Sequence, residues 1–253
     1  MFTRQELSLL KELTLREFKL RYQNSVLGFF WSLLKPFALF LTFYVVLQYF
    51  LKINVPDYAF FLLIGILLWN FFSESTTAGL HGLVSKGSII KKTYFKYELC
   101  IISACLTAFI SFLLNFFVFL VLLVILKGVP GLSLFYLPLP FLEIFFISLG
   151  LSFFLAPLFT QYRDISHVWE ILLQIGFWVT PIAYPLDFVP KQYLSYYLLN
   201  PLANIVVHVR ESILQAQIPS FFSGFASFIL AIAISLLGYL FYNIKKKSIA
   251  ERL

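Results

Sequence analysis

Ionisable side chains inside apolar segments are the residues of this sequence that could move protons or ions. They are few: Glu143 is the only carboxylate well inside an apolar run, and Glu74 and Glu170 lie near the ends of others. A membrane-buried carboxyl group can take up and release a proton as a coupled ion passes. A proton relay needs several such groups, so we expect a partner to supply any energy for uphill transport.

Side chains that could act as nucleophiles or metal ligands form no recognisable site. His81, His167 and His208 are scattered singly, and Cys100 and Cys105 are interpreted as small buried apolar residues. No H-E-x-x-H, G-x-S-x-G or Cys/His metal spacing is present. No G-x-x-x-x-G-K-[ST] motif exists for a nucleotide. The sequence predicts no catalytic residue, no metal site and no cofactor in this chain.

Aromatic residues are the other chemical resource, with 32 Phe, 14 Tyr and 4 Trp. Most are expected to face lipid, pack between helices or lie at the membrane interfaces. Rings that carry a hydroxyl or an N–H group also suit weak, repeated contacts with the apolar faces and polar edges of sugars. The candidate substrate-path residues are Trp31, Phe37, Tyr44, Trp169, Trp178 and Tyr184.

Long apolar segments must position these side chains. The chain is 60% hydrophobic and only 12% charged, whereas soluble domains carry roughly 25% charged residues. The apolar runs are continuous and too long for barrel strands, which favours helices. We predict a single all-α integral membrane domain over residues 1–253 with six transmembrane helices. They are expected at 29–51, 58–77, 99–126, 137–159, 169–184 and 220–242. Spans one to five thus fall within 29–184, and the sixth falls within 220–243. Pro36, Pro157 and Pro181 lie within or near span ends, where kinks are expected.

Lysine and arginine set the expected orientation. Of the 19 such residues, only Lys52, Lys127, Lys191 and Arg210 fall in segments that this topology places outside. Cytoplasmic loops carry the excess of these residues in membrane proteins. Both termini are therefore predicted to be cytoplasmic, including a tail at 244–253, and no cleavable signal peptide is visible.

Residues 185–219 join the fifth and sixth spans on the predicted outer side. Residues 193–209 are free of charge, but Asn200-Pro201 interrupts them, and a seventh crossing would place Lys245, Lys246 and Lys247 outside. We predict re-entrant short helices that line or cap a pathway, because irregular backbone at that depth must pack on protein or face a water-filled cavity. An interfacial hairpin on lipid headgroups is the alternative.

Two segments are predicted on the cytoplasmic side. Residues 1–28 should contain an amphipathic interface helix, either a simple anchor or a lever that senses a partner. Its apolar stripe is Leu7, Leu10, Leu13, Phe18 and Leu20. The loop at 81–98 is basic and also apolar, so it could contact anionic lipid or another protein. Its lysines are Lys86, Lys91, Lys92 and Lys96.

Three blocks of sequence carry a resemblance to a known family. The first, at 21–37, contains Arg21, Tyr22, Ser25, Leu27, Gly28, Trp31, Ser32 and Pro36. The second, at 162–185, begins Tyr162-Arg163-Asp164-Ile165 and closes with Thr180-Pro181-Ile182 and Tyr184-Pro185. The third is Leu199-Asn200-Pro201-Leu202. In this order they resemble the polysaccharide-export permeases of the ABC transporter superfamily, although Lys35 replaces a residue that is often neutral and polar in that family.

That resemblance implies a permease that forms a homodimer and pairs with two copies of a separate ABC ATPase, which binds ATP and Mg. The implied substrate is an undecaprenyl-linked polysaccharide, O-antigen-like or teichoic-acid-like, crossing the bacterial inner membrane; no nucleic-acid partner is implied. The implied coupling residues are Gly82, Lys86, Gly87, Ile90, Lys91, Lys92, Arg163 and Asp164. The implied outer gate is the segment at 185–219, with Asn200 and Pro201.

Three other functions stay open from the sequence. The first is an ABC permease for a drug or lipid, which sequence separates least well. The second is an ion-coupled secondary transporter that uses Glu143. The third is a membrane enzyme such as a glycosyl transferase acting on a lipid carrier, although no cluster of acids is visible.

Overall fold

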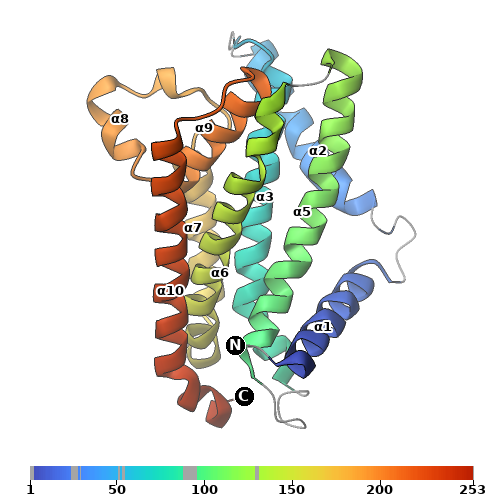
Figure 1. Ribbon diagram of the computed structural model, residues 1–253, viewed down its shortest axis with the longest axis vertical. Coiled ribbons are helices and arrows are strands. Elements are labelled where there is room, and N and C mark those ends of the chain that lie inside the picture. Colours follow the sequence, from blue (N-terminus) through green and yellow to red (C-terminus); the bar gives the residue numbers. More distant parts are fainter. Residues whose placement is uncertain are drawn as a thin grey trace.

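The computed structural model describes residues 3–23, 28, 30–50, 52, 55–87, 96–128 and 131–252. Within these ranges the chain is helical and contains no strand. Figure 1 shows a bundle of long helices, with α1 (Arg4–Tyr22) and both chain ends at one end of it. The short helices α8 (Lys191–Tyr197) and α9 (Pro201–Leu214) lie at the opposite end. We call these the α1 end and the α9 end.

Five helical segments are long and apolar enough to cross a membrane. They are α2 (Phe30–Tyr44) with the π-helical turn η1 (Val45–Phe50), α3 (Tyr58–His81), α5 (Glu98–Lys127), η3 (Leu132–Tyr136) with α6 (Pro138–Gln161), and α10 (Phe221–Arg252). These helices match the first four predicted spans and the sixth within a few residues at most ends. Helix α10 also runs through residues 244–252, which had been assigned to a tail.

The helix at the predicted fifth span begins four residues earlier and ends five residues earlier than predicted. Helix α7 covers Ile165–Val179, 15 residues, or about 22 Å at 1.5 Å per residue, against the roughly 30 Å of a hydrocarbon core. The boundaries 169–184 were wrong because Thr180 has extended backbone (φ −93°, ψ 140°), as the residue before a proline prefers. Six crossings therefore remain a prediction.

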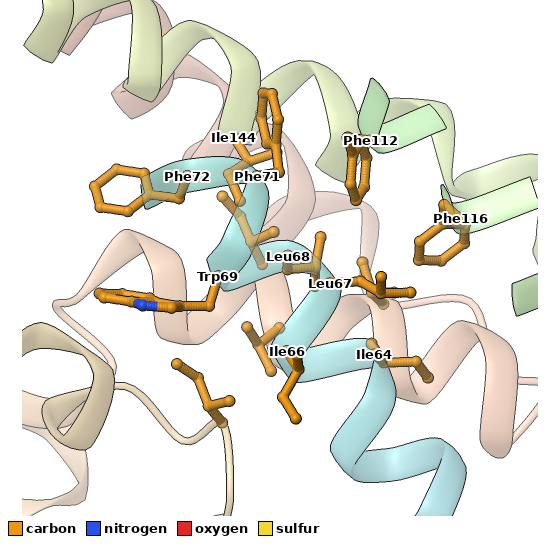
Figure 2. Close-up of a cluster of buried hydrophobic side chains, with 14 of the residues drawn as sticks. Ile64, Ile66, Leu67, Leu68, Trp69, Phe71, Phe72, Phe112, Phe116 and Ile144 are labelled. Carbon is orange, nitrogen blue, oxygen red and sulfur yellow. The ribbon is translucent and has the colours of Figure 1, made fainter. Parts of the chain in front are cut away.

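Helix α3 forms the centre of the bundle. In the most apolar 18-residue stretch of each span, the share of buried residues is 56% for α3 and 61% for Leu132–Gln161. It is only 11% for Phe30–Phe50 and 22% for α10. Figure 2 shows side chains of α3 packed between Phe112 and Phe116 of α5 and Ile144 of α6. Helices α3 and α6 are thus inner elements, and α2 and α10 keep large surfaces for lipid or other partners.

Helices α6 and α10 pack with almost no side chains between them at one crossing. A Cβ atom on Gly238 would lie 2.0 Å from the carbonyl oxygen of Gly150, and one on Gly150 would lie 2.6 Å from that of Ile234. Small residues let membrane helices approach this closely. The two glycines therefore fix the position of α10 against α6.

Local signals explain where several helices begin. In α1, the Thr3 hydroxyl accepts a hydrogen bond from the Glu6 backbone N–H, and the Glu6 carboxylate accepts one from the Thr3 N–H. This reciprocal pair is a capping box. Helix α6 begins with Pro138, whose missing N–H costs nothing in the first helical turn.

Candidate functional site

Helix α1 is held against the bundle by a partly buried ion pair near the α1 end. Glu17 pairs with Lys86, which lies in the short helix η2 (Val84–Lys86). The Lys86 Nζ also donates to the carbonyl oxygen of Cys100 and to the Ser103 hydroxyl, both at 2.7 Å. Ser103 in turn donates to Glu17 at 3.0 Å. One lysine therefore joins α1, the α3–α5 connection and α5.

Two further ion pairs join α1 to the bundle. Lys96 lies 3.0 Å from the Glu6 carboxylate, and Arg21 pairs with Glu74 of α3. The Thr3 backbone N–H, followed by Lys96, lowers the pKa of Glu6 below its ordinary value. We call the three pairs Glu6–Lys96, Glu17–Lys86 and Arg21–Glu74 the N-terminal clasp. It ties α1 to α3, to η2 and to Lys96, which precedes α5.

The residues expected to couple to an ATPase differ in how exposed they are. Gly82 and Lys86 are buried, and Gly87 is half-buried. Arg163 and Asp164 are exposed in the α6–α7 turn at the α1 end, where the Arg163 guanidinium lies 5.0 Å from the Phe159 ring. Ile90, Lys91 and Lys92 lie outside the described residues. The exposed members stay candidates for direct contact, whereas Lys86 can act only through its partners.

At the α9 end, a buried arginine holds the link between α7 and α8. Arg210 of α9 is 5% exposed and donates to the carbonyl oxygens of Phe61 (3.1 Å), Pro181 (2.5 Å) and Ile182 (2.7 Å). Its guanidinium also lies 3.4 Å from the centre of the Phe61 ring. Gly65 makes room for this arrangement, because a Cβ there would lie 2.7 Å from an Arg210 nitrogen.

Two other side chains form hydrogen bonds with the same link between α7 and α8. The Tyr58 hydroxyl donates to the Ala183 carbonyl oxygen at 2.7 Å, and the Asn200 amide donates to the Thr180 hydroxyl at 3.2 Å. With Arg210, they contact every residue from 180 to 183. We call Tyr58, Asn200 and Arg210 the outer clamp.

The Asn200-Pro201 pair separates α8 from α9, as the sequence predicts for a break at this point. The Asn200 side-chain oxygen accepts a hydrogen bond from the Leu202 N–H at 3.0 Å, and Pro201 is the first residue of α9. These are ordinary signals for the start of a helix. The pair therefore fixes where α9 begins and, through Thr180, ties that start to the end of α7. Its role as a gate stays a prediction.

The aromatic candidates do not form one continuous surface in a single chain. Trp178 is 57% exposed on α7, and its carbonyl oxygen accepts a hydrogen bond from the Tyr184 hydroxyl at 2.5 Å. Trp178 also contacts Phe43 of α2, with ring centres 5.9 Å apart. These residues form an aromatic seam between α2 and α7.

The remaining aromatic candidates lie elsewhere. Tyr44 packs on Tyr58 near the outer clamp, and the indole N–H of Trp169 donates to the Thr76 hydroxyl at 3.1 Å. Trp31 and Phe37 are exposed on α2. A path lined by all six would therefore have to be completed by a second copy of the chain.

Glu143 is fully buried in α6, and its carboxylate accepts a hydrogen bond from Ser227 of α10 at 3.0 Å. Its second oxygen has no hydrogen-bond partner among the described residues. Nothing in the described part of the chain joins it to a second carboxylate. Cys100 and Cys105 are free and buried, as interpreted from the sequence.

Sequence reasoning missed Glu17, Tyr58 and Arg210. A signal existed for Arg210, because an arginine beside an apolar run marks a functional position by default. A signal also existed for Glu17: Glu6, Thr14, Glu17 and Arg21 recur at near-helical spacing on one face of α1. Tyr58 carried no signal that separates it from the other tyrosines.

Comparison with known proteins places the chain among transporters. It is 28% identical over 204 residues to the O-antigen export system permease protein RfbA of Klebsiella pneumoniae, covering 80% of this chain and 79% of that one. It is 27% identical over 213 residues to the RfbA of Myxococcus xanthus, covering 83% and 82%. Identity to the polysialic acid transport protein KpsM of Escherichia coli is 27% over 210 residues, 81% of each chain. The model of the ABC-2 type transporter family matches residues 8–214, and the chain therefore belongs to that family.

Proposed function

We propose that this chain is the membrane subunit of an ATP-driven exporter that moves an undecaprenyl-linked polysaccharide across the bacterial inner membrane. The observation that carries the proposal is the similarity to RfbA and KpsM, named for O-antigen export and polysialic acid transport, over about four fifths of each chain. A chain without a P-loop motif needs a separate subunit to hydrolyse ATP. We therefore propose a homodimer of permeases with two copies of an ABC ATPase.

The N-terminal clasp supports a route for coupling. Binding of ATP by the partner displaces α1 and the segment between α3 and α5, and the pair Glu17–Lys86 makes these two elements move together. Arg163 and Asp164 supply an exposed contact at the same end of the bundle. Because a buried ion pair is costly to separate, the clasp transmits displacement instead of absorbing it.

The surface of α7 supports a path between two copies. Exposed apolar side chains recur along α7 every three or four residues and form a stripe on one side of the helix. They are Val168, Ile171, Leu172, Ile175, Trp178 and Val179. In the proposed dimer this stripe and the aromatic seam face the second permease. Separation of the two copies opens a path with many weak aromatic contacts for sugar rings. The outer clamp holds the α7–α8 link that closes this path on the outer side.

The first experiment is a pull-down of the tagged full chain from its own membranes, followed by an ATPase assay with and without lipid-linked polysaccharide. A co-purifying ATPase that the glycan stimulates is expected. Charge reversal at Arg163 should weaken co-purification, and the matched change Lys127→Glu at the α9 end should not. A chain that arrives without a hydrolysing partner would contradict the proposal and favour ion coupling.

The aromatic path has its own test. Trp178→Ala combined with Tyr184→Ala should reduce glycan export, with the ATPase still bound to the permease. Val179→Ala, which alters a neighbouring exposed position on α7 without removing a ring, serves as the matched control. Export at the normal rate in the double variant would exclude the path while leaving the exporter assignment intact.

A further inference from the structure

A polar cavity lies among α2, α3 and α5, close to the end of α1. Its volume is about 410 Å³, within the usual range for ligand pockets. The side chains that give it polar character are Arg21, Ser32, Lys35, Asn70, Ser73, Glu74, Thr77, His81 and Asn115. Most of these lie on helices that are otherwise apolar, so they mark a place where a polar group enters the bundle.

An apolar groove of about 270 Å³ adjoins this cavity. Pro36, Leu67 and Asn115 line both, so the two spaces are neighbours. The groove is otherwise lined by hydrocarbon and aromatic side chains, among them Phe30, Leu34, Leu63 and Val118. A polar space and an apolar space thus lie side by side, and we treat them as the two halves of one candidate site.

The two halves are ordered along the membrane normal as the parts of a lipid are. Helix α5 runs from the α1 end to the α9 end, and it contributes positions 108–115 to the polar cavity and 115–122 to the groove. Helix α3 runs in the opposite direction and contributes positions 67–81 to the cavity and 63–67 to the groove. The polar half therefore lies nearer the α1 end of the bundle, and the apolar half lies nearer the α9 end.

The charges on the cavity leave one cation uncompensated. Arg21 is paired with Glu74, whereas Lys35 forms no ion pair or hydrogen bond with any described residue. The side-chain nitrogen of Asn70 is buried and lacks a hydrogen-bond acceptor within the described ranges. A lysine, an unused amide donor and a net charge of about +1 fit a group with one negative charge and several acceptor oxygens.

We propose that this site binds one phospholipid with a singly charged phosphodiester headgroup, from the leaflet on the α1 side. The phosphate contacts Lys35 and the Asn70 amide, and one acyl chain lies in the groove between α2 and α5. A phosphodiester matches Lys35, which among the described residues is the lysine of the cavity without an ion-pair partner, whereas the diphosphate of a lipid-linked glycan would bring at least twice the negative charge. The site is separate from the aromatic seam, which lies where α2 meets α7. The bound lipid fills the space between α2 and the inner helices.

The test is native mass spectrometry of the purified full chain, titrated with phosphatidylglycerol or with phosphatidylethanolamine, which has no net charge. One phosphatidylglycerol should bind with roughly tenfold preference, the size expected for a charge-assisted contact. Lys35→Gln should abolish the preference and Lys35→Arg should keep it. Lys11→Gln, which removes an exposed charge on α1 away from the cavity, is the matched control.

A second variant tests the groove. Val118→Trp fills the apolar half without changing charge, and it should reduce retention of the lipid while the protein stays monodisperse. Equal binding of the two phospholipids, or an unchanged preference in Lys35→Gln, would overturn the proposal. Displacement of phosphatidylglycerol by an equal concentration of undecaprenyl diphosphate, dependent on Lys35, would also overturn it and assign the site to the transport substrate.

Discussion

At the scale of single residues, buried charge in this protein is neutralised in two different ways. Lys86 pairs with a carboxylate, whereas Arg210 donates only to backbone carbonyl oxygens and stacks on Phe61. The planar guanidinium can serve several acceptors at once, and an ammonium group cannot do so with the same geometry. The two sites should therefore respond differently to conservative substitutions.

The Glu17–Lys86 pair should show a large interaction energy in a double-mutant cycle. Glu17→Gln leaves the buried Lys86 ammonium without its carboxylate and should destabilise the chain by about 3 kcal/mol. Lys86→Met leaves the partly exposed Glu17 carboxylate without its cation and should have a smaller effect. The double variant should lose less than the sum, by roughly 1–3 kcal/mol. Denaturant titration of the purified chain measures both values. Additive losses would show that the pair is not the contact that holds α1.

The same variants should uncouple ATP hydrolysis from export. In the complex with its ATPase, the single variants should lower the amount of glycan exported per ATP hydrolysed. Lys11→Met on the exposed side of α1 is the control. An unchanged ratio in a folded Lys86→Met protein would remove the clasp from the coupling route.

Arg210→Lys should loosen the outer clamp although it keeps the charge. Carbonyl oxygens left without a donor destabilise the fold by about 1–3 kcal/mol, and residues 186–199 should become more accessible to protease. Thermal unfolding and limited proteolysis measure these effects, with Lys191→Gln as a control on exposed α8. If Arg210→Lys has the stability and the protease resistance of the wild type, the three hydrogen bonds of the guanidinium are not needed to hold the outer clamp.

Residue positions were predictable from sequence only where the signal was local. Asn200-Pro201 marks the start of α9 because capping depends on residues one or two positions away. By contrast, Glu17 and Arg21 pair with Lys86 and Glu74, which lie far from them in the sequence. Such partners are brought together by the packing of α1 on the bundle, and no short-range pattern identifies them.

At the scale of helices, hydrophobic length predicted most of the spans, and proline chemistry explains the error. The apolar run at 169–184 continues past Pro181, but the helix ends at Val179 because Thr180 is extended. Hydropathy does not detect this change in backbone. It likewise gave no indication that α10 continues beyond its apolar part to Arg252.

The contact between α6 and α10 should tolerate no added atoms. Gly238→Ala places a methyl group against the Gly150 carbonyl oxygen, and overpacking of this kind costs about 1–3 kcal/mol. Thermal unfolding should show the loss. Leu237→Ala, one position away and 66% exposed, should have a small effect. If Gly238→Ala unfolds like the wild type, the helices separate more easily than their packing indicates.

At the scale of the whole molecule, the number of crossings depends on α7. If α7 crosses the membrane, the α6–α7 turn and the α7–α8 link lie on opposite sides. Single cysteines at Arg163 and Asp187, in a chain whose Cys100 and Cys105 are replaced by serine, can be labelled in intact cells with a membrane-impermeant thiol reagent. We expect labelling at position 187 and protection at 163. The same accessibility at both positions would contradict six crossings.

The backbone contact of Gly150 with Gly238 has a consequence for how the molecule can deform. Two helices whose main chains touch cannot slide past each other without breaking that fit, so we expect α6 and α10 to behave as one rigid unit. We therefore expect any movement to involve α2 with α7, which meet through the rings of Phe43, Phe177 and Trp178. In the proposed dimer we expect opening to be asymmetric within each subunit, with α6 and α10 fixed and α2 and α7 moving across their aromatic contacts.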